Sequence, residues 1–198
     1  MPILSPADIP DIEEARRRLL DLIRERSVRR GRFRLSSGRE ATAYVDLRRV
    51  TTHPEAAFLC ALLLIDLMRG FRPDAAGGPT LGADPLAGSL GVMSHILGVP
   101  LRTFIVRSDA KEHGTGRLVE GSLEPGDRTL VLDDVATSGA SLLRAAEAVA
   151  SEGATVVGVL AILDREAGAA QAVAAKGIPF RSLFTMSEVM EGPIPGAT

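Results

Sequence analysis

The chain has 198 residues, 45% of them hydrophobic and 24% charged, and a formal net charge of −2. These values are typical of a soluble globular protein with a substantial core, so we predict a single domain over residues 1–198. The near-neutral charge disfavours nucleic acid as a partner, the single cysteine excludes an internal disulfide and favours a cytoplasmic setting, and no apolar run is long enough to cross a membrane.

The N-terminal quarter of the chain has a pattern of its own. Apolar residues at helical spacing predict a helix over residues 11–28, with arginine and glutamate on its other face. Two short strands are expected after it, over residues 33–35 and 43–47. Because these elements precede the regular pattern of the remaining chain, we predict a small accessory element over about residues 1–45, followed by a core over about 46–198.

From about residue 55 onward, helical and strand patterns alternate. Such alternation predicts an α/β fold, in which a mostly parallel sheet is flanked by crossover helices. The expected helices cover residues 55–68, 85–97, 138–151 and 167–175, and the expected strands cover 101–106, 129–132, 154–163 and 178–183. A polar segment over residues 108–122 interrupts the alternation, and such a segment between strands is typical of a functional loop.

The strand predicted over residues 129–132 runs directly into two carboxylates, Asp133 and Asp134, and a helix follows within a few residues. Ligands of open α/β sheets bind at the carboxyl ends of the strands, and the N-terminus of a helix binds phosphate through its free N–H groups. The carboxylates would accept hydrogen bonds from ribose hydroxyls, and the turn at residues 137–139 would hold a phosphate. A plain helix cap is the alternative, and the paired acids before Thr-Ser-Gly disfavour it.

Four cationic residues lie within the polar segment or at its edge: Arg107, Lys111, His113 and Arg117. Cations that close over a polyanionic ligand would stabilise its charge where water is excluded. Arg107 offers a planar fork, Lys111 a point charge, and His113 a group that titrates near neutral pH. The alternative is a solvated surface loop without function, and spacing alone does not decide between the two.

Several stretches together resemble the type I phosphoribosyltransferases, and among them the orotate phosphoribosyltransferases. They are residues 35–39 with 44–48, residues 82–88, residues 107–121, and residues 133–141 with Asp164 and Arg165 beyond. The resemblance covers nearly the whole chain. It implies the type I phosphoribosyltransferase fold with a small N-terminal hood. It also implies transfer of a phosphoribosyl group from phosphoribosyl pyrophosphate (PRPP) to orotate, which gives orotidine 5-phosphate and pyrophosphate in pyrimidine biosynthesis.

The resemblance implies roles for individual residues. Lys111, His113, Asp133 and Asp134 would be the catalytic residues. The residues that bind PRPP would be Arg107, Lys111, His113, Asp133, Asp134, Val135, Ala136, Thr137, Ser138, Gly139, Ala140 and Ser141. Thr137 and Arg165 would contact orotate. Arg165 follows a predicted strand, so its fork suits an anionic base there, although an ordinary surface pair with Asp164 is the alternative.

Magnesium (Mg²⁺) is implied by the substrate, because it prefers oxygen ligands and bridges phosphates while keeping several waters. We expect no direct protein ligand, with Asp133 and Asp134 acting on the ion through ribose hydroxyls and water. The resemblance further implies a homodimer in which the loop over residues 108–120 acts in the site of the neighbouring subunit.

One position departs from the orotate pattern, in which a lysine usually follows Arg107. Here Ser108 follows it, and Asp109 comes next, so a cation is absent and an anion is added. This departure predicts weaker PRPP binding than in a Ser108→Lys variant. It also leaves two alternatives open: a phosphoribosyltransferase for a purine or another pyrimidine, and a regulator that binds PRPP without turnover.

Overall fold

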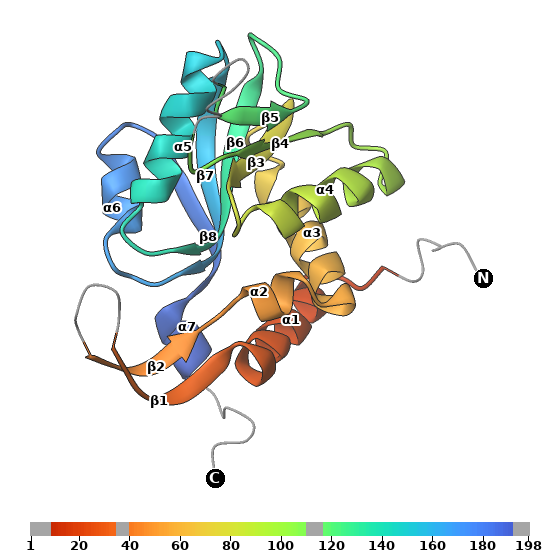
Figure 1. The fold of residues 1–198 in the computed structure, drawn as a ribbon. Helices are drawn as coiled ribbons and strands as arrows, with labels where there is room; N and C mark the ends of the chain where they lie inside the picture. Colours follow the sequence, from red (N-terminus) through yellow and green to blue (C-terminus); the bar gives the residue numbers. More distant parts are fainter. Residues whose placement is uncertain (1–8, 35–39, 110–116, 192–198) are drawn as a thin grey trace.

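The structure is a computed structural model that describes residues 9–34, 40–109 and 117–191. The main sheet has six strands in the order β5-β4-β3-β6-β7-β8, and only β5, at one edge, runs antiparallel to its neighbour (Figure 1). These strands are β3 (Ala75–Pro79), β4 (Arg102–Val106), β5 (Val119–Gly121), β6 (Arg128–Ala136), β7 (Thr155–Asp164) and β8 (Phe180–Thr185). The predicted α/β fold with a mostly parallel sheet is confirmed.

Helices cover both faces of this sheet (Figure 1). They are α3 (Pro54–Met68) and α4 (Asp84–Ile96) on one face, and α5 (Ala140–Ser151) and α6 (Ala169–Ala174) on the other. Successive residues of a strand point to opposite faces, so Leu130 and Leu132 pack under α3 and α4, whereas Val131 packs under α5. Burial on both faces explains why β6 and β7 are continuous apolar runs in the sequence.

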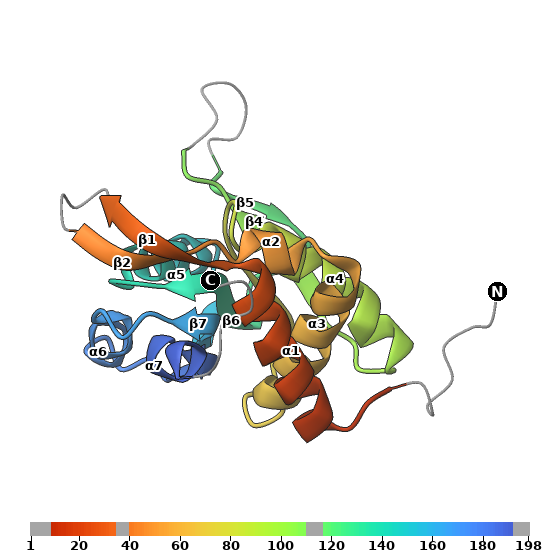
Figure 2. The ribbon, with the colours of Figure 1, turned by 90° about the horizontal axis from the view of Figure 1, so that it is seen from below.

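The N-terminal element consists of α1 (Ile12–Arg26) and a separate antiparallel ribbon of β1 (Val28–Arg34) and β2 (Glu40–Val45), followed by the short helix α2 (Arg48–Thr51). Figure 2 shows α1 lying alongside α3, and its apolar face belongs to the same hydrophobic cluster as the sheet. A last short helix, α7 (Met186–Met190), packs against α1. We call α1, β1, β2, α2 and α7, with the segments that join β1, β2 and α2 to one another, the hood.

Strand β3 was not predicted, although it lies in the middle of the sheet between β4 and β6. Its first four residues are Ala-Ala-Gly-Gly, which have none of the β-branched character of a typical strand. A Cβ atom at Gly77 would overlap the backbone of Phe104, and one at Gly78 would overlap the backbone of Leu132. The close approach of the neighbouring strands therefore requires glycine at these positions.

Two other boundaries differ from the prediction. Strand β6 continues to Ala136, four residues beyond the predicted end, because its pairing with β7 carries on past the apolar run. The two carboxylates at positions 133 and 134 therefore lie within the last part of the strand. The first helix ends at Arg26, and the hairpin begins at Val28, earlier than predicted, because Val28 already pairs with Val45. In the described part of the chain, no helix has the length and apolarity needed to span a bilayer.

Candidate active site

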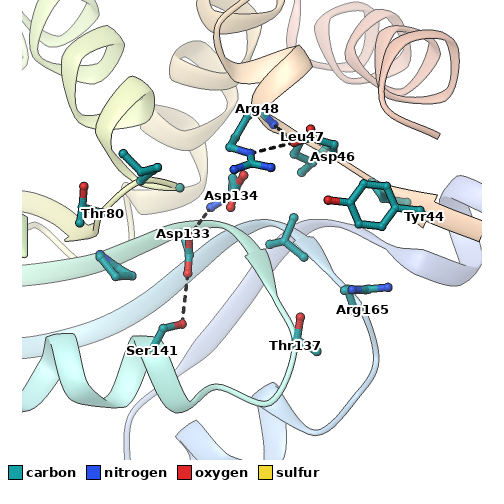
Figure 3. A pocket seen from close by; sticks show the side chains of 15 residues that line it. Tyr44, Asp46, Leu47, Arg48, Thr80, Asp133, Asp134, Thr137, Ser141 and Arg165 are labelled. Atoms are coloured by element: carbon teal, nitrogen blue, oxygen red, sulfur yellow. Dashed lines mark hydrogen bonds and ion pairs between the residues drawn. The ribbon is translucent and has the colours of Figure 1, made fainter. Parts of the chain in front are cut away.

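A cavity of about 410 Å³ lies at the carboxyl ends of β3, β6 and β7, beneath the segment that joins β2 to α2 (Figure 3). The residues that line it come from four parts of the chain. They are Tyr44, Val45, Asp46, Leu47 and Arg48; Pro79, Thr80, Leu81 and Gly82; Asp133, Asp134, Val135, Thr137 and Ser141; and Arg165. Three carboxylates and two guanidinium groups therefore face one space, which suits a ligand that carries both hydroxyls and negative charge.

The buried acid pair Asp133 and Asp134 forms the floor of this cavity. The N–H of Asp134 donates to Asp133 Oδ1 at 2.9 Å, and the Ser141 hydroxyl donates to Asp133 Oδ2 at 3.4 Å (Figure 3). Burial, and then the charge of Asp134, raise the pKa of Asp133 to about 8, and burial also raises the pKa of Asp134. The pair is thus poised to accept hydrogen bonds or to meet a cation, either of which would favour its ionised form.

The backbone of the turn between β3 and α4 lies in close contact with the acid pair. A Cβ atom at Gly82 would overlap carboxylate oxygens of both Asp133 and Asp134. Thr80 stands beside this glycine, and its hydroxyl donates to Asp84 Oδ2 at 2.5 Å, in the first turn of α4. The turn therefore fixes the two carboxylates from above and leaves little room for any larger residue at position 82.

The hood supplies the opposite wall. Arg48 donates to Asp46 Oδ1 at 2.9 Å, and this hydrogen bond lowers the pKa of Asp46. Arg48 is also near enough to Asp134 for its charge to act against the effect of burial on the pKa of that carboxyl. Tyr44 lies farther along, at the same end of the cavity as Arg165 (Figure 3). One wall of the cavity thus carries a compensated charge pair and an aromatic ring.

Comparison with known proteins identifies the family. Residues 47–177 match the family described as phosphoribosyl transferase domain. The orotate phosphoribosyltransferase of Aquifex aeolicus is 42% identical over 178 residues, which are 88% of this chain and 97% of the relative. The crystal structure of the Mycobacterium tuberculosis orotate phosphoribosyltransferase with Fe(III) dicitrate superposes with a TM-score of 0.80 at 44% identity, covering 89% of this chain and 99% of that one. The chain belongs to the orotate phosphoribosyltransferases.

A further structure of the Mycobacterium tuberculosis enzyme, in complex with PRPP, is similar with a TM-score of 0.76 and 40% identity, covering 88% of this chain and 98% of that one. The fold predicted from the resemblance, that of a type I phosphoribosyltransferase, is confirmed for this family member.

Six of the site residues predicted from the sequence line the cavity. They are Asp133, Asp134, Val135, Thr137, Ser141 and Arg165. The other predicted residues of the phosphate turn, Ala136, Ser138, Gly139 and Ala140, connect β6 to α5. This turn is anchored on the β7 side, since the N–H of Arg165 donates to the Ala136 carbonyl at 2.9 Å and the N–H of Ala169 donates to the Thr137 carbonyl at 3.0 Å.

Of the cationic residues predicted to bind PRPP in the polar loop, the structure describes Arg107. Arg107 lies just past the end of β4 and lines a second, smaller cavity that adjoins the first. Lys111 and His113 lie outside the described residues. The sequence prediction gave no role to Tyr44, Asp46 or Arg48, although they stand within a stretch that carried the family resemblance. The sequence signal that could have found them is an aromatic residue and two opposite charges at the end of a strand.

Proposed function

We propose that the cavity between the sheet edge and the hood is where a phosphoribosyl group passes from PRPP to orotate, as part of UMP synthesis in the cytoplasm. The observation that carries this proposal is the buried acid pair on β6, which lies between the phosphate turn and the cationic end of β4. Such a pair offers acceptors for two neighbouring ribose hydroxyls, while the N-terminus of α5 offers donors for a phosphate. The alternative of a regulator without turnover would need the same ligand site, so turnover must be measured.

In this arrangement, the ribose would lie over Asp133 and Asp134, and its 5-phosphate would lie against the turn from Thr137 to Ser141. Gly139 has a φ of +81°, which glycine adopts without strain and which lets the backbone turn directly into α5. Catalysis would rest on position and charge: carbon 1 of the ribose becomes cationic as pyrophosphate leaves, and a nitrogen of the base attacks from the opposite face.

The base would lie between the hood and the end of β7. Arg165 is half-buried there, and its planar fork suits a carboxylate. Thr137 lines the same space, and the ring of Tyr44 faces it from the hood (Figure 3). We infer that Arg165 binds the orotate carboxylate, which distinguishes orotate from uracil.

Magnesium fits the floor of the cavity. Asp133 and Asp134 present oxygen atoms, the ligand type that magnesium prefers, and burial raises the pKa of both carboxyls, so a nearby cation would favour their ionised forms. Bound with PRPP, the ion would neutralise charge on the phosphates. As the sequence analysis expects, the two carboxylates would not bind the ion directly. They would accept hydrogen bonds from the ribose hydroxyls and from water that the ion holds.

Wild-type protein should lower the absorbance of orotate when PRPP and magnesium are added, and uracil or hypoxanthine should give no turnover. Replacing Arg165 with glutamine should raise the Michaelis constant for orotate about tenfold, which corresponds to about 1.4 kcal/mol, and should change that for PRPP much less. Arg69→Gln is a matched control, because Arg69 is 76% exposed at the end of α3 and does not line the cavity. Turnover of another base, or an unchanged orotate constant in Arg165→Gln, contradicts the proposal.

We also propose that the protein acts as a homodimer in which Lys111 and His113 serve the neighbouring site. Lys111→Ala and Asp133→Asn should each have little activity as pure proteins. If the loop acts across the subunits, a mixture should regain activity, since one site of each hybrid then has an intact loop and an intact acid pair. Activity that stays at the level of the two pure variants, with hybrid formation verified by mass, would show that the loop serves its own subunit.

A further inference from the structure

A second cavity, of about 120 Å³, opens beside the first at the ends of β3 and β4. The two share Pro79, Thr80 and Ser141, so the smaller one adjoins the larger, and we call it the side arm. Arg107 and Ser108 line the arm from the end of β4, and Arg144 lines it from α5. Arg144 lies three residues beyond Ser141, on the same helix, and no role was predicted for it.

The charges of the two spaces differ. The main cavity is lined by three carboxylates and two guanidinium groups, whereas the described lining of the arm holds two guanidinium groups, three hydroxyls and no carboxylate. Arg107 donates to the main-chain carbonyl of Asp109 at 3.2 Å. Among the residues that the structure describes, Arg144 has no hydrogen-bond or ion-pair partner. A space whose described lining holds two guanidinium groups and no carboxylate favours an anionic ligand.

The order of the strands would set this arm at one end of a substrate bound as proposed above. Along the sheet edge, β4, β3, β6 and β7 follow one another and present Arg107, Thr80, the acid pair and Arg165 in that order. With the ribose over β6 and the base at β7, the group on the other side of the ribose lies toward β3 and β4. In PRPP that group is the pyrophosphate.

We propose that Arg144 binds the pyrophosphate of PRPP and supplies, beside Arg107, a second positive charge that Ser108 does not provide. This inference rests on the proposed function, because it takes PRPP as the ligand. The Ser108 hydroxyl donates to Asp109 Oδ2 at 2.9 Å, which occupies both groups with each other. The long side chain of Arg144 reaches the same space from the helix.

The proposal is tested with Arg144→Gln, with Arg69→Gln as the control that loses the same charge at a residue that lines neither cavity. In the forward direction, the Michaelis constant for PRPP should rise about tenfold. In the reverse direction, that for pyrophosphate should rise by a similar factor. The dissociation constant of orotidine 5-phosphate, which has a 5-phosphate and no pyrophosphate, should stay within about twofold of that of the wild type.

Two outcomes overturn the proposal. If pyrophosphate binds Arg144→Gln as it binds the wild type, Arg144 does not contact it. If orotidine 5-phosphate weakens as much as pyrophosphate does, Arg144 holds the 5-phosphate instead. Failure of the proposed function is seen separately, as wild-type protein that does not turn over orotate, and pyrophosphate binding can then still be measured by calorimetry on both proteins.

A second variant separates charge from folding. Ser108→Lys combined with Arg144→Gln returns a cation to the arm from the opposite side, and it should recover at least half of the lost pyrophosphate affinity, on a logarithmic scale. If the added lysine recovers none, the effect of Arg144→Gln does not arise from charge in this arm, and the proposal is wrong.

Discussion

The main cavity has two walls: the sheet wall, formed by the acid pair Asp133 and Asp134 described above as its floor, and the hood wall, formed by residues 44–48. The two walls differ in how the chain holds them in place. The sheet wall carries Asp133 and Asp134 on a central strand that is buried on both faces, and the backbone of Gly82 presses on both carboxylates. The hood wall, residues 44–48, continues from a two-stranded ribbon that is separate from the main sheet. The acid pair therefore cannot shift without disturbing the sheet. The hood wall is held by Val45 and Leu47, which belong to the same hydrophobic cluster as the sheet, and it has no strand pairing with the sheet.

Polar contacts of α1 with the C-terminal part of the chain add to the packing of its apolar face against the core. Arg16 donates to the Leu183 carbonyl at 3.1 Å, pairs with Glu188 at 2.6 Å and lies 4.6 Å from the centroid of the Phe184 ring. Arg24 donates to the carbonyls of Glu188 and Val189. Because these contacts are polar and partly exposed, each stabilises the protein modestly. We therefore expect sheet-wall changes to lower turnover most, and hood changes to alter mainly the affinity for the base.

The largest effect is expected at the sheet wall, in Gly82→Ala. The new Cβ atom would overlap both carboxylates, so Asp133 or Asp134 must move. Misplacement of a catalytic group by about 1 Å can lower a rate about 100-fold, and we expect a loss of kcat/KM of that order. Gly88→Ala, in the exposed part of α4 with no atom within 4 Å of the added Cβ, should keep wild-type activity. Similar kcat/KM values for the two variants would show that the turn does not fix the acid pair.

The second effect, in Asp133→Asn, separates activity from stability. The pKa of Asp133 is about 8 in the folded protein against an ordinary value of 3.8, so between these pH values the folded state holds a proton that the unfolded state has released. The stability that this carboxyl contributes therefore falls as the pH rises from about 4 to about 8. Asparagine has no such loss and can still accept from the N–H of Asp134.

Asp133→Asn should thus be less active by about tenfold or more and yet more stable at pH 8, by about 1–2 kcal/mol. Thermal unfolding at pH 5 and pH 8 checks this, because the advantage of the variant in Tm should grow with pH over that interval. If the Tm of Asp133→Asn at pH 8 is below that of the wild type, ionisation of the pair does not destabilise the folded protein.

The same contrast separates what could be predicted from the sequence from what could not. The acid pair, the phosphate turn and Arg165 follow apolar strands directly, so local sequence placed them at one sheet edge. Strand β3 was not predicted because its glycines are required by the close approach of the β4 and β6 backbones, which are distant in sequence. Its omission left Thr80 and Gly82 without a place at the site.

The hood wall and the side arm depend on tertiary contacts alone. Nothing in the spacing of Asp46 and Arg48 shows that they face Asp134, which lies more than eighty residues further along the chain. Arg144 stands on a helix whose buried face could be predicted, but its meeting with Arg107 requires α5 to lie over the end of β4. Periodicity assigns faces to elements, and it does not show which elements meet.

A smaller effect is expected at the hood, in Arg16→Met. Methionine keeps contact with the Phe184 ring and removes the pair with Glu188 and the bond to the Leu183 carbonyl. We expect the Michaelis constant for orotate to rise about threefold with little change in kcat, and stability to fall by about 1 kcal/mol. The neighbouring exposed residue gives the control, Arg17→Met. A large fall in kcat with an unchanged orotate constant would contradict the division between the two walls.

The smallest effect is expected in the side arm, in Ser108→Lys, where a cation is added to a space already lined by Arg107 and Arg144. The Michaelis constant for PRPP should fall about threefold, since an added charge in a partly solvated site contributes less than about 1 kcal/mol. The gain should shrink when the ionic strength rises from about 0.05 to 0.5 M, because salt screens exposed charges. Ser122→Lys adds the same charge at an exposed position outside both cavities and should have no such effect. Equal constants for Ser108→Lys and the wild type at one magnesium concentration would show that Arg107 and Arg144 already satisfy the pyrophosphate, and that the serine does not weaken PRPP binding.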